Sequence, residues 1–454
     1  MFKKLLIPLI SLAIIILGTI VAIRWGKGYR PTRQGIQGTG LLAANSFPAG
    51  AQVFINGKLT TATDDTLNLP PSEYDVEIKK DGYFPWKKHL IVQAELVTQT
   101  NATLFPAVPS LTPLTFTGAV NVTPSPDGTK LALVMTKATV SSQNGLYILD
   151  LAASPLAFRS NARQIARGVT GLELATAEIL WSPDSRQIIL QFVSNDNLLI
   201  SATELNDLTT TADVTSRLPL ILSQWEEELT LAETQKLLLL PDEMQKVATA
   251  SAKNSYFSPD ETKLMYTATE AVIIPEELIP ALPSSNTQPE ERSLEPGGIY
   301  IYDLKEDRNF RIGSEQTPPA ELPEGTVPAK TLLAELSRSL ALNLGLTPTA
   351  SPAAYRKLQA EKTSKETVAS FKRHYSSLYL NNYQWFPTSR HLIINTAAGL
   401  EVVEYDGTNR LTLYSGPRVD DFVYAWPDGS KLVILTNLGS NDDTPVNLYS
   451  ISLK

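Results

Sequence analysis

Side chains able to carry chemistry are few and scattered in this chain. Three histidines occur, at His89, His374 and His391, and no two of them stand at the spacing of metal ligands. The chain has no cysteine, which excludes disulfides, thiolate zinc sites and a cysteine nucleophile. The G-x-S-x-G, P-loop and dinucleotide-binding fingerprints are also missing. We therefore predict no catalytic residue, no metal site and no cofactor.

Each histidine has a structural interpretation. His391 stands at a turn position where related turns carry Lys or Gln, so we expect a solvated turn residue. His89 follows two lysines, and a surface position is expected. His374 follows a lysine and an arginine near the end of an expected helix, where a cation is favourable.

Aspartates recur in one turn motif, which organises most of the chain. The motif is aromatic–Ser–Pro–Asp or a variant of it, and three apolar residues follow each turn shortly afterwards. Proline fixes φ, while Ser and Asp hydrogen-bond the local backbone. We interpret the aspartates as turn residues and not as a calcium site, because each serves its own repeat in the same way. The five turns are Ser125–Asp127, Trp181–Asp184, Phe257–Asp260, Trp385–Thr388 and Trp426–Asp428.

A strand that is apolar on both faces packs between neighbours, and five such units in a row predict a β-propeller. The repeats resemble those of TolB-type and WD-repeat-like propellers over about residues 111–454. We place the propeller at 110–454, with five blades and room for a sixth in an insertion. A strand at Leu114–Phe116 precedes the first turn and is expected to complete the last blade, closing the ring.

Three insertions interrupt the repeats. The first, near 205–254, is expected to hold a helix with an S-x-x-E capping box starting at Ser223, and a second helix opened by Pro241. The second, near 275–296, is rich in Pro and Glu and is expected to be a mobile loop. The third, near 312–377, is expected to begin without regular structure and to continue into two helices.

A small β-domain is expected before the propeller. Strand Val53–Ile55 enters an Asn56-Gly57 turn, the strongest two-residue hairpin signal. Over about residues 40–105 the chain resembles the PEGA domain, through Pro48–Ala51, the Asn-Gly-Lys turn and Lys80–Tyr83. The resemblance implies a surface-type β-sandwich without known catalytic residues.

Phe84 and Trp86 flank Pro85 in a loop of this small domain. We interpret them as a possible contact site for a partner. A packing role is the alternative.

The N-terminus differs in composition from the rest. Leu5–Ile23 carries no charge and would span about 28 Å as a helix, which predicts a transmembrane anchor over residues 1–25 and a tether over 26–39. A cleavable signal peptide is the alternative. Six basic residues and no acidic residue lie among the first 35, so all 47 acidic residues belong to the remainder. That acidic remainder argues against a nucleic-acid partner.

The predicted fold class is mainly β: a transmembrane helix, a small PEGA-like β-sandwich and a propeller with helical insertions. We expect a non-enzymatic, single-pass membrane protein of a prokaryotic cell envelope, with its globular part outside the cytoplasm, whose propeller binds a protein or a glycan. The alternatives are a propeller-type hydrolase, in which carboxylates meet from distant blades, and a structural protein that links the cell wall or surface layer.

Overall fold

The computed structural model describes residues 2–26, 30–32, 35–151, 162–194, 196–280, 282, 286–315, 371, 382–419, 422–438 and 445–454. The N-terminal helix α1 (Phe2–Gly26) has its side chains described over Ser11–Arg24. Within the described residues, no helix is long and apolar enough to cross a membrane. The prediction of a transmembrane helix is therefore wrong.

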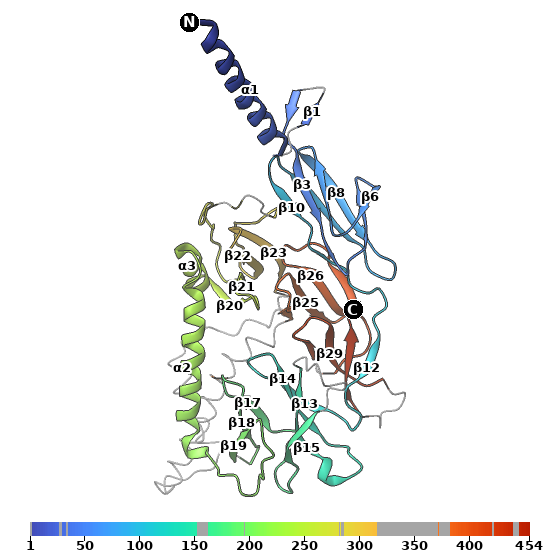
Figure 1. The fold of residues 1–454 in the computed structure, drawn as a ribbon. Coiled ribbons are helices and arrows are strands. Elements are labelled where there is room, and N and C mark those ends of the chain that lie inside the picture. Colours follow the sequence, from blue (N-terminus) through green and yellow to red (C-terminus); the bar gives the residue numbers. More distant parts are fainter. Residues whose placement is uncertain are drawn as a thin grey trace.

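The small β-domain lies between α1 and the propeller (Figure 1). Two of its sheets enclose an apolar core that includes Leu42, Val53 and Ile78. The hairpin forms as the sequence predicts, since Asn56 and Gly57 both adopt positive φ, at 49° and 77°. The strands are β3 (Gly40–Ala44), β4 (Ser46–Phe47), β5 (Gln52–Ile55), β6 (Lys58–Ala62), β7 (Asp65–Leu69), β8 (Ser72–Lys79), β9 (Trp86–Val92), β10 (Val97–Gln99) and β11 (Ala102–Thr103).

Two details of this region were not predicted. β9 pairs with β8, and β10 runs parallel to β3. In the segment expected to be a tether, β1 (Arg30–Thr32) pairs with β2 (Gly35–Gln37).

Five antiparallel sheets follow within the described residues, and we number them as blades 1 to 5 in chain order. Blade 1 contains β13 (Val120–Pro124), β14 (Lys130–Met135), β15 (Gly145–Asp150) and β16 (Arg163–Arg167); blade 2 contains β17 (Glu178–Trp181), β18 (Gln187–Gln191) and β19 (Asn197–Ser201); blade 3 contains β20 (Ala252–Phe257), β21 (Lys263–Ala268), β22 (Gly298–Asp303) and β23 (Arg308–Ser314); blade 4 contains β24 (Tyr383–Trp385), β25 (His391–Thr396), β26 (Gly399–Glu404) and β27 (Leu411–Tyr414); blade 5 contains β28 (Val423–Ala425), β29 (Lys431–Thr436), β30 (Asn447–Ser452) and β12 (Leu111–Pro113).

The last blade is completed as predicted, by a strand from the start of the propeller. β12 pairs with the C-terminal strand β30, three residues earlier in the chain than the sequence suggested. Apolar clusters join blade 1 to blade 2, blade 3 to blade 4, blade 4 to blade 5 and blade 5 to blade 1. Among the described residues no such cluster joins blade 2 to blade 3.

The recurring turns hold each blade at one end. In blade 1 the Ser125 hydroxyl donates to Asp127 at 2.6 Å and accepts from the Lys130 amide at 3.0 Å. Ser182 and Ser258 make the same bonds in blades 2 and 3. The aspartates therefore act locally, as predicted. The residue that directly follows each of the five turn ranges has a left-handed backbone, with φ between 58° and 71°; these residues are Gly128, Ser185, Glu261, Ser389 and Gly429.

Two helices bridge blades 2 and 3. α2 (Leu218–Leu237) packs its first half on the blade 1–2 core, and α3 (Asp242–Ala250) packs on blade 3. In Figure 1 α2 runs along the side of the molecule between these blades. α3 begins after Pro241 as predicted. The capping box at Ser223 is wrong, because α2 starts five residues earlier with Pro219 in its first turn.

The other two insertions differ in how much of them is described. The segment near 275–296, expected to be a mobile loop, is held by polar contacts: Asn286 donates to Asp406 at 2.7 Å and Gln288 donates to the His89 carbonyl at 2.7 Å. Of the segment near 312–377, the structure describes 312–315 and the buried Phe371, which contacts Trp225. The helices expected there otherwise lie outside the described residues, as does His374.

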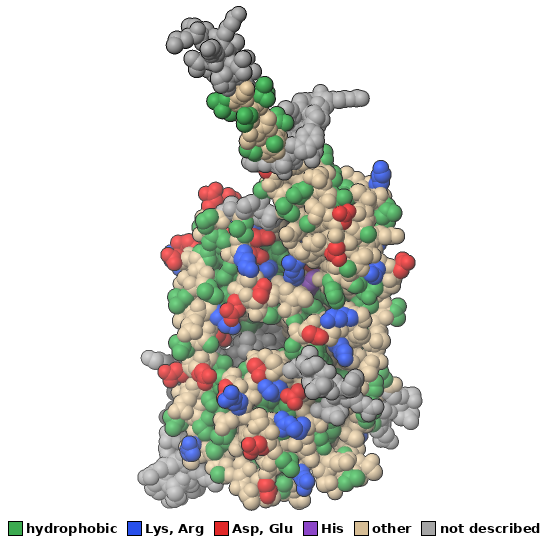
Figure 2. Space-filling view, viewed as in Figure 1, with side chains coloured by type: hydrophobic (Ala, Val, Ile, Leu, Met, Phe, Trp, Pro, Cys, Tyr) green, Lys and Arg blue, Asp and Glu red, His purple; other side chains and the backbone are tan. Residues whose placement is uncertain are grey.

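Charge is dispersed over the face shown in Figure 2. Lys and Arg side chains alternate there with Asp and Glu, and neither sign forms a stripe. A nucleic-acid footprint would gather the basic side chains on one face.

Candidate functional site

The contact between blades 1 and 2 (junction 1–2) repeats the contact between blades 3 and 4 (junction 3–4). The difference between these two junctions locates the candidate site. At junction 1–2 the Trp181 indole donates to the Thr123 carbonyl at 3.4 Å; at junction 3–4 Trp385 donates to the Tyr256 carbonyl at 3.2 Å. A serine hydroxyl also accepts from an aspartate amide at both, at 3.1 Å for Asp127 and 3.0 Å for Asp260. Blades 1 and 2 are therefore the structural counterparts of blades 3 and 4.

Junction 1–2 is filled by apolar side chains at the end of the blades opposite the turns. Val120 pairs with Val134 across β13 and β14. Phe192, just after β18, is buried in the same cluster as Val134, and Val120 packs against it. Through these three side chains, blades 1 and 2 are in direct apolar contact.

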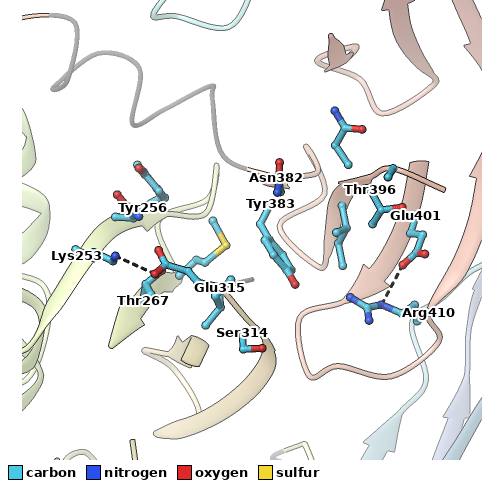
Figure 3. Close-up of a pocket in the computed structure, with 16 residues that line it drawn as sticks. Lys253, Tyr256, Thr267, Ser314, Glu315, Asn382, Tyr383, Thr396, Glu401 and Arg410 are labelled. Carbon is cyan, nitrogen blue, oxygen red and sulfur yellow. Dashed lines mark ion pairs between the residues drawn. The ribbon is translucent and has the colours of Figure 1, made fainter. Parts of the chain in front are cut away.

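Junction 3–4 carries polar residues at the same positions. Lys253 pairs with Thr267 in the register of Val120 and Val134. Thr396 follows Asn395 at the end of β25, where Phe192 follows Gln191 in blade 2. A cleft of about 810 Å³ opens here (Figure 3), because the side chains that would fill it are shorter or charged. We call it the 3–4 cleft.

The 3–4 cleft has an apolar floor and a charged rim. Its floor includes Tyr256, Met265 and Ile394, which belong to the blade 3–4 core. On the rim Lys253 pairs with Glu315 at 2.9 Å and Arg410 pairs with Glu401 at 3.3 Å, and Figure 3 shows the pairs on opposite sides with Tyr383 between them. The described lining thus carries two cations and two anions, and suits a ligand without large net charge.

A second pocket, of about 480 Å³, lies where the turns of blades 1, 3, 4 and 5 meet. Prolines and aromatic rings dominate its described lining, and Asp127 is the one carboxylate there. Partial burial opposes ionisation, but hydrogen bonds from Lys130, Ser125 and Thr129 lower the pKa of Asp127 to about 2. Asp127 is thus an ionised structural group, and the described lining offers no second carboxylate to work with it.

The aromatic pair predicted as a contact site lies at the junction of the two domains. Trp86 is 2% exposed and donates its indole N–H to Glu404 of blade 4. Phe84 is half-buried against the core of blades 4 and 5. Trp86 therefore has the packing role given as the alternative, because the propeller of the same chain covers it.

Lys88 anchors the same junction with a buried ion pair. Its ammonium lies 2.5 Å from Asp406 and 2.6 Å from Glu404, and the lysine side chain is 8% exposed. Burial disfavours the charged amine, yet the two carboxylates raise the pKa of Lys88. Burial likewise opposes ionisation of Asp406, but Lys88 and the hydrogen bonds from Asn286 and Thr408 lower its pKa. The small domain is therefore fixed to the propeller.

The position of His391 contradicts the prediction of a solvated turn residue. It is buried, not solvated, because Phe105 from the end of the small domain packs edge-on against it at 5.3 Å. Burial, together with the charge of Lys88, lowers its pKa to about 3. His89 is exposed as predicted, beside Asp75 and Glu73. Within the described part of the chain, no group of His and carboxylate side chains is placed to hold a metal ion.

The fold and its contacts define a two-domain protein, a small β-sandwich fixed to a β-propeller. Residues 39–107 match the family model of the PEGA domain, which confirms that resemblance. A search among curated proteins finds no match.

Solved structures similar to the chain include propellers. A protein assigned as TolB from Agrobacterium tumefaciens is 13% identical, with a TM-score of 0.21, and the match covers 74% of this chain and 77% of that one. TolB from Acinetobacter baumannii is 10% identical, with a TM-score of 0.21, covering 84% of this chain and 59% of that one. An oligogalacturonate lyase in complex with manganese is 10% identical, with a TM-score of 0.20, covering 84% and 74%. The predicted resemblance to TolB is thus found, and likenesses this distant carry no argument about function.

Sequence reasoning missed the 3–4 cleft, although a signal existed. Aligning the repeats on their prolines places Lys253 with Val120 and Thr396 with Phe192. Both replacements put a polar side chain where the filled junction has an apolar one.

Proposed function

We propose that this protein is a non-enzymatic binding protein of a prokaryotic cell envelope, in which the small domain and the propeller form one rigid body and the 3–4 cleft receives a partner. The observation that carries the proposal is the difference between two equivalent junctions, one filled and one open. Concave sites with an apolar floor and a few polar groups are where ligands bind preferentially.

The contacts between the domains support a scaffold. Lys88, Trp86 and Gln288 each cross from one domain to the other or to its insertion loop, and the first two bond to carboxylates of blade 4. A buried charge that loses its partner costs several kcal/mol. Relative motion of the domains is therefore opposed, and the cleft is presented in a fixed orientation.

The hydrolase alternative finds less support at the 3–4 cleft and at the pocket between the turns. A glycosidase needs two carboxyl groups about 5–10 Å apart, one of them free to carry a proton. The described lining of the pocket between the turns has Asp127 alone, and the two glutamates of the 3–4 cleft are each paired with a cation. A purely structural role in linking the wall would leave the cleft without a ligand.

We also propose that the globular part lies outside the cytoplasm. The absence of cysteine agrees with an oxidising compartment, where a free thiol would be a liability. Protease added to intact cells should degrade the propeller. Its survival under conditions that digest a known surface protein would contradict this location.

The function is tested by capture from envelope fractions with the full chain as bait. The matched control is the variant Lys253→Val/Thr267→Val/Thr396→Phe, which transfers the filled junction to blades 3 and 4. We expect the wild type to retain a partner that the filled variant loses. If the wild type captures nothing and instead turns over a glycan or a peptide, the binding proposal is wrong.

A further inference from the structure

We propose that a pocket between the small domain and the propeller binds an uncharged saccharide, held by Glu306 of blade 3 and Arg390 of blade 4. The pocket lies at the turn end of these blades and shares no described lining residue with the 3–4 cleft. Saccharide binding there would be additional to the function proposed for the cleft.

The pocket is built from both domains and has a volume of about 340 Å³. We call it the interdomain pocket. Small-molecule sites have volumes of roughly 300–1,000 Å³, so it suits a small ligand and not a folded partner. Its described lining comes from within residues 88–101 of the small domain, 260–263 and 303–306 of blade 3, 282–287 of the insertion loop, and 388–391 and 404–405 of blade 4.

Contacts between described residues hold the walls of the interdomain pocket in place. Lys88 of the small domain pairs with Glu404 of blade 4 at 2.6 Å. The Ile91 amide donates to the Thr287 hydroxyl of the insertion loop at 3.3 Å. A ligand therefore meets walls that are already ordered, which reduces the entropy lost on binding.

The described lining is polar and balanced in charge. A strongly anionic ligand would need an excess of cations, and an apolar ligand would need a mainly apolar wall, whereas Leu90 and Leu282 are the aliphatic side chains of this lining. The pocket therefore suits a ligand that is polar and uncharged. Its charged side chains are four basic ones, Lys88, Lys263, Lys305 and Arg390, and four acidic ones, Asp260, Asp303, Glu306 and Glu404.

Glu306 and Arg390 keep most of their hydrogen-bonding capacity. Glu306 accepts one hydrogen bond, from the Asn286 amide at 2.7 Å, and Arg390 donates one, to the Asn101 carbonyl at 3.3 Å. Neither side chain forms an ion pair with another described residue. A carboxylate has about four acceptor sites and a guanidinium five donors, so each can take further partners from a ligand.

The environment of Glu306 favours a ligand that brings donors. Burial raises the pKa of Glu306, although the hydrogen bond from the Asn286 amide opposes this effect. The ionised carboxylate is thus incompletely solvated by the protein. A hydroxyl group donated by a ligand would stabilise it.

A saccharide meets these requirements together. A hydroxyl group both donates and accepts, so it can bond to a carboxylate or to a guanidinium, and hydrogen bonds to ionised groups are the stronger ones. Several hydroxyls on one ring can reach Glu306 on the blade 3 wall and Arg390 on the blade 4 wall. Both residues lie in turns and hairpins of the blades, whereas residues 281 and 283–285, which flank Leu282, lie outside the described residues.

The test is a calorimetric titration of the full-length protein with neutral mono- and disaccharides of glucose, galactose, mannose and N-acetylglucosamine. We expect at least one of them to bind saturably, with a dissociation constant on the order of 1 mM or tighter. Arg390→Ala and Glu306→Gln should each weaken binding about tenfold, because each removes charge-assisted hydrogen bonds. Glutamine keeps an acceptor for the Asn286 amide, and Arg390 is exposed, so both variants should fold.

Arg410→Ala is the matched control, because it removes an exposed arginine from the 3–4 cleft. It should leave the saccharide affinity within about twofold, since distant sites act independently. The filled-cleft variant Lys253→Val/Thr267→Val/Thr396→Phe should also bind the saccharide as the wild type does. Circular dichroism checks that each variant is folded.

Three outcomes would overturn the inference. The first is that no saccharide of this set binds, and the second is that Arg390→Ala and Glu306→Gln bind as tightly as the wild type. The third is that galacturonate or glycine binds more tightly than every neutral saccharide, which would make the ligand an anion or a zwitterion. Envelope capture by the wild type and the filled-cleft variant tests the 3–4 cleft separately, so either proposal can fail alone.

Discussion

Junctions 1–2 and 3–4 share their turns, their tryptophan bonds and their bulges, yet one is packed and the other is a cleft. The shared features all lie in the inner strands and turns, where each repeat must fit its neighbour. The difference lies in three side chains at the opposite end of the blades, Val120, Val134 and Phe192 against Lys253, Thr267 and Thr396. A propeller can therefore open a site between blades without changing its backbone, because the turn contacts and the apolar core of blades 3 and 4 still join the two blades.

The largest expected effect comes from opening the filled junction. Phe192→Thr removes a buried ring and should lower the free energy of unfolding by about 3–5 kcal/mol. The reciprocal change, Thr396→Phe, places a ring in a cleft with room for it and should change stability by less than about 1 kcal/mol. Urea unfolding of both variants measures the difference. Equal losses would mean that the two junctions are packed alike.

A second prediction compares the turns of blades 2 and 4. The position of His391 is taken by the exposed Gln187 in blade 2. Burial lowers the pKa of His391 from 6.5 to about 3, so the unfolded state binds more protons between these values and stability falls as the pH drops below 6.5. At pH 5 the loss is on the order of 2 kcal/mol, and it should vanish in His391→Gln.

The control for this prediction is His89→Gln. The hydrogen bond to Asp75 raises the pKa of the exposed His89, so its contribution has the opposite sign, present at low pH and lost as the pH rises through the raised pKa. A pH dependence of wild-type stability that persists in His391→Gln would show that the domain junction does not bury this ring.

A third prediction compares the two bulge asparagines. Asn121→Gly leaves two carbonyls without their donor and should lower stability by about 1–3 kcal/mol. Asn254→Gly removes an amide without a described partner and should change stability by less than about 0.5 kcal/mol. Both positions have the same φ, so the backbone effect of glycine cancels in the difference between the two unfolding curves.

The smallest effect concerns the turn aspartates. Lys130 pairs with Asp127 at 2.8 Å, whereas the Lys263 side chain turns to Asp303 at 3.2 Å. Because the folded pKa of Asp127 is about 2, its contribution is full above the unfolded value near 3.8 and is lost as the pH falls towards 2. Asp127→Asn should therefore flatten the acid unfolding profile more than Asp260→Asn does. A larger flattening in Asp260→Asn than in Asp127→Asn would show that the ion pair with Lys130 does not account for the low pKa of Asp127.

Local patterns determined much of this fold. The Ser-Pro-Asp turns, the Asn56-Gly57 hairpin and the runs of apolar residues are short-range features, and each formed where the sequence placed it, because turn chemistry and alternation act within a few residues. The closing strand was also predicted, since a strand without a blade of its own must pair with the last one. The capping box at Ser223 was wrong, because a four-residue motif does not fix where a helix starts. The membrane-spanning helix was wrong as well.

Only the tertiary structure determined the contacts between residues that are far apart in the chain. The burial of His391 beneath Phe105, the pairing of Lys88 with Glu404 and Asp406, and the covering of Trp86 all depend on how the small domain meets blade 4. The residues around Lys88 do not predict its burial, because the blade that buries it lies more than 300 residues away in the chain, while the neighbouring His89 is exposed. The sequence alone determined five repeats and a PEGA-like domain. Which junction is filled, and where a cleft opens, depends on side chains that meet only after the ring has closed.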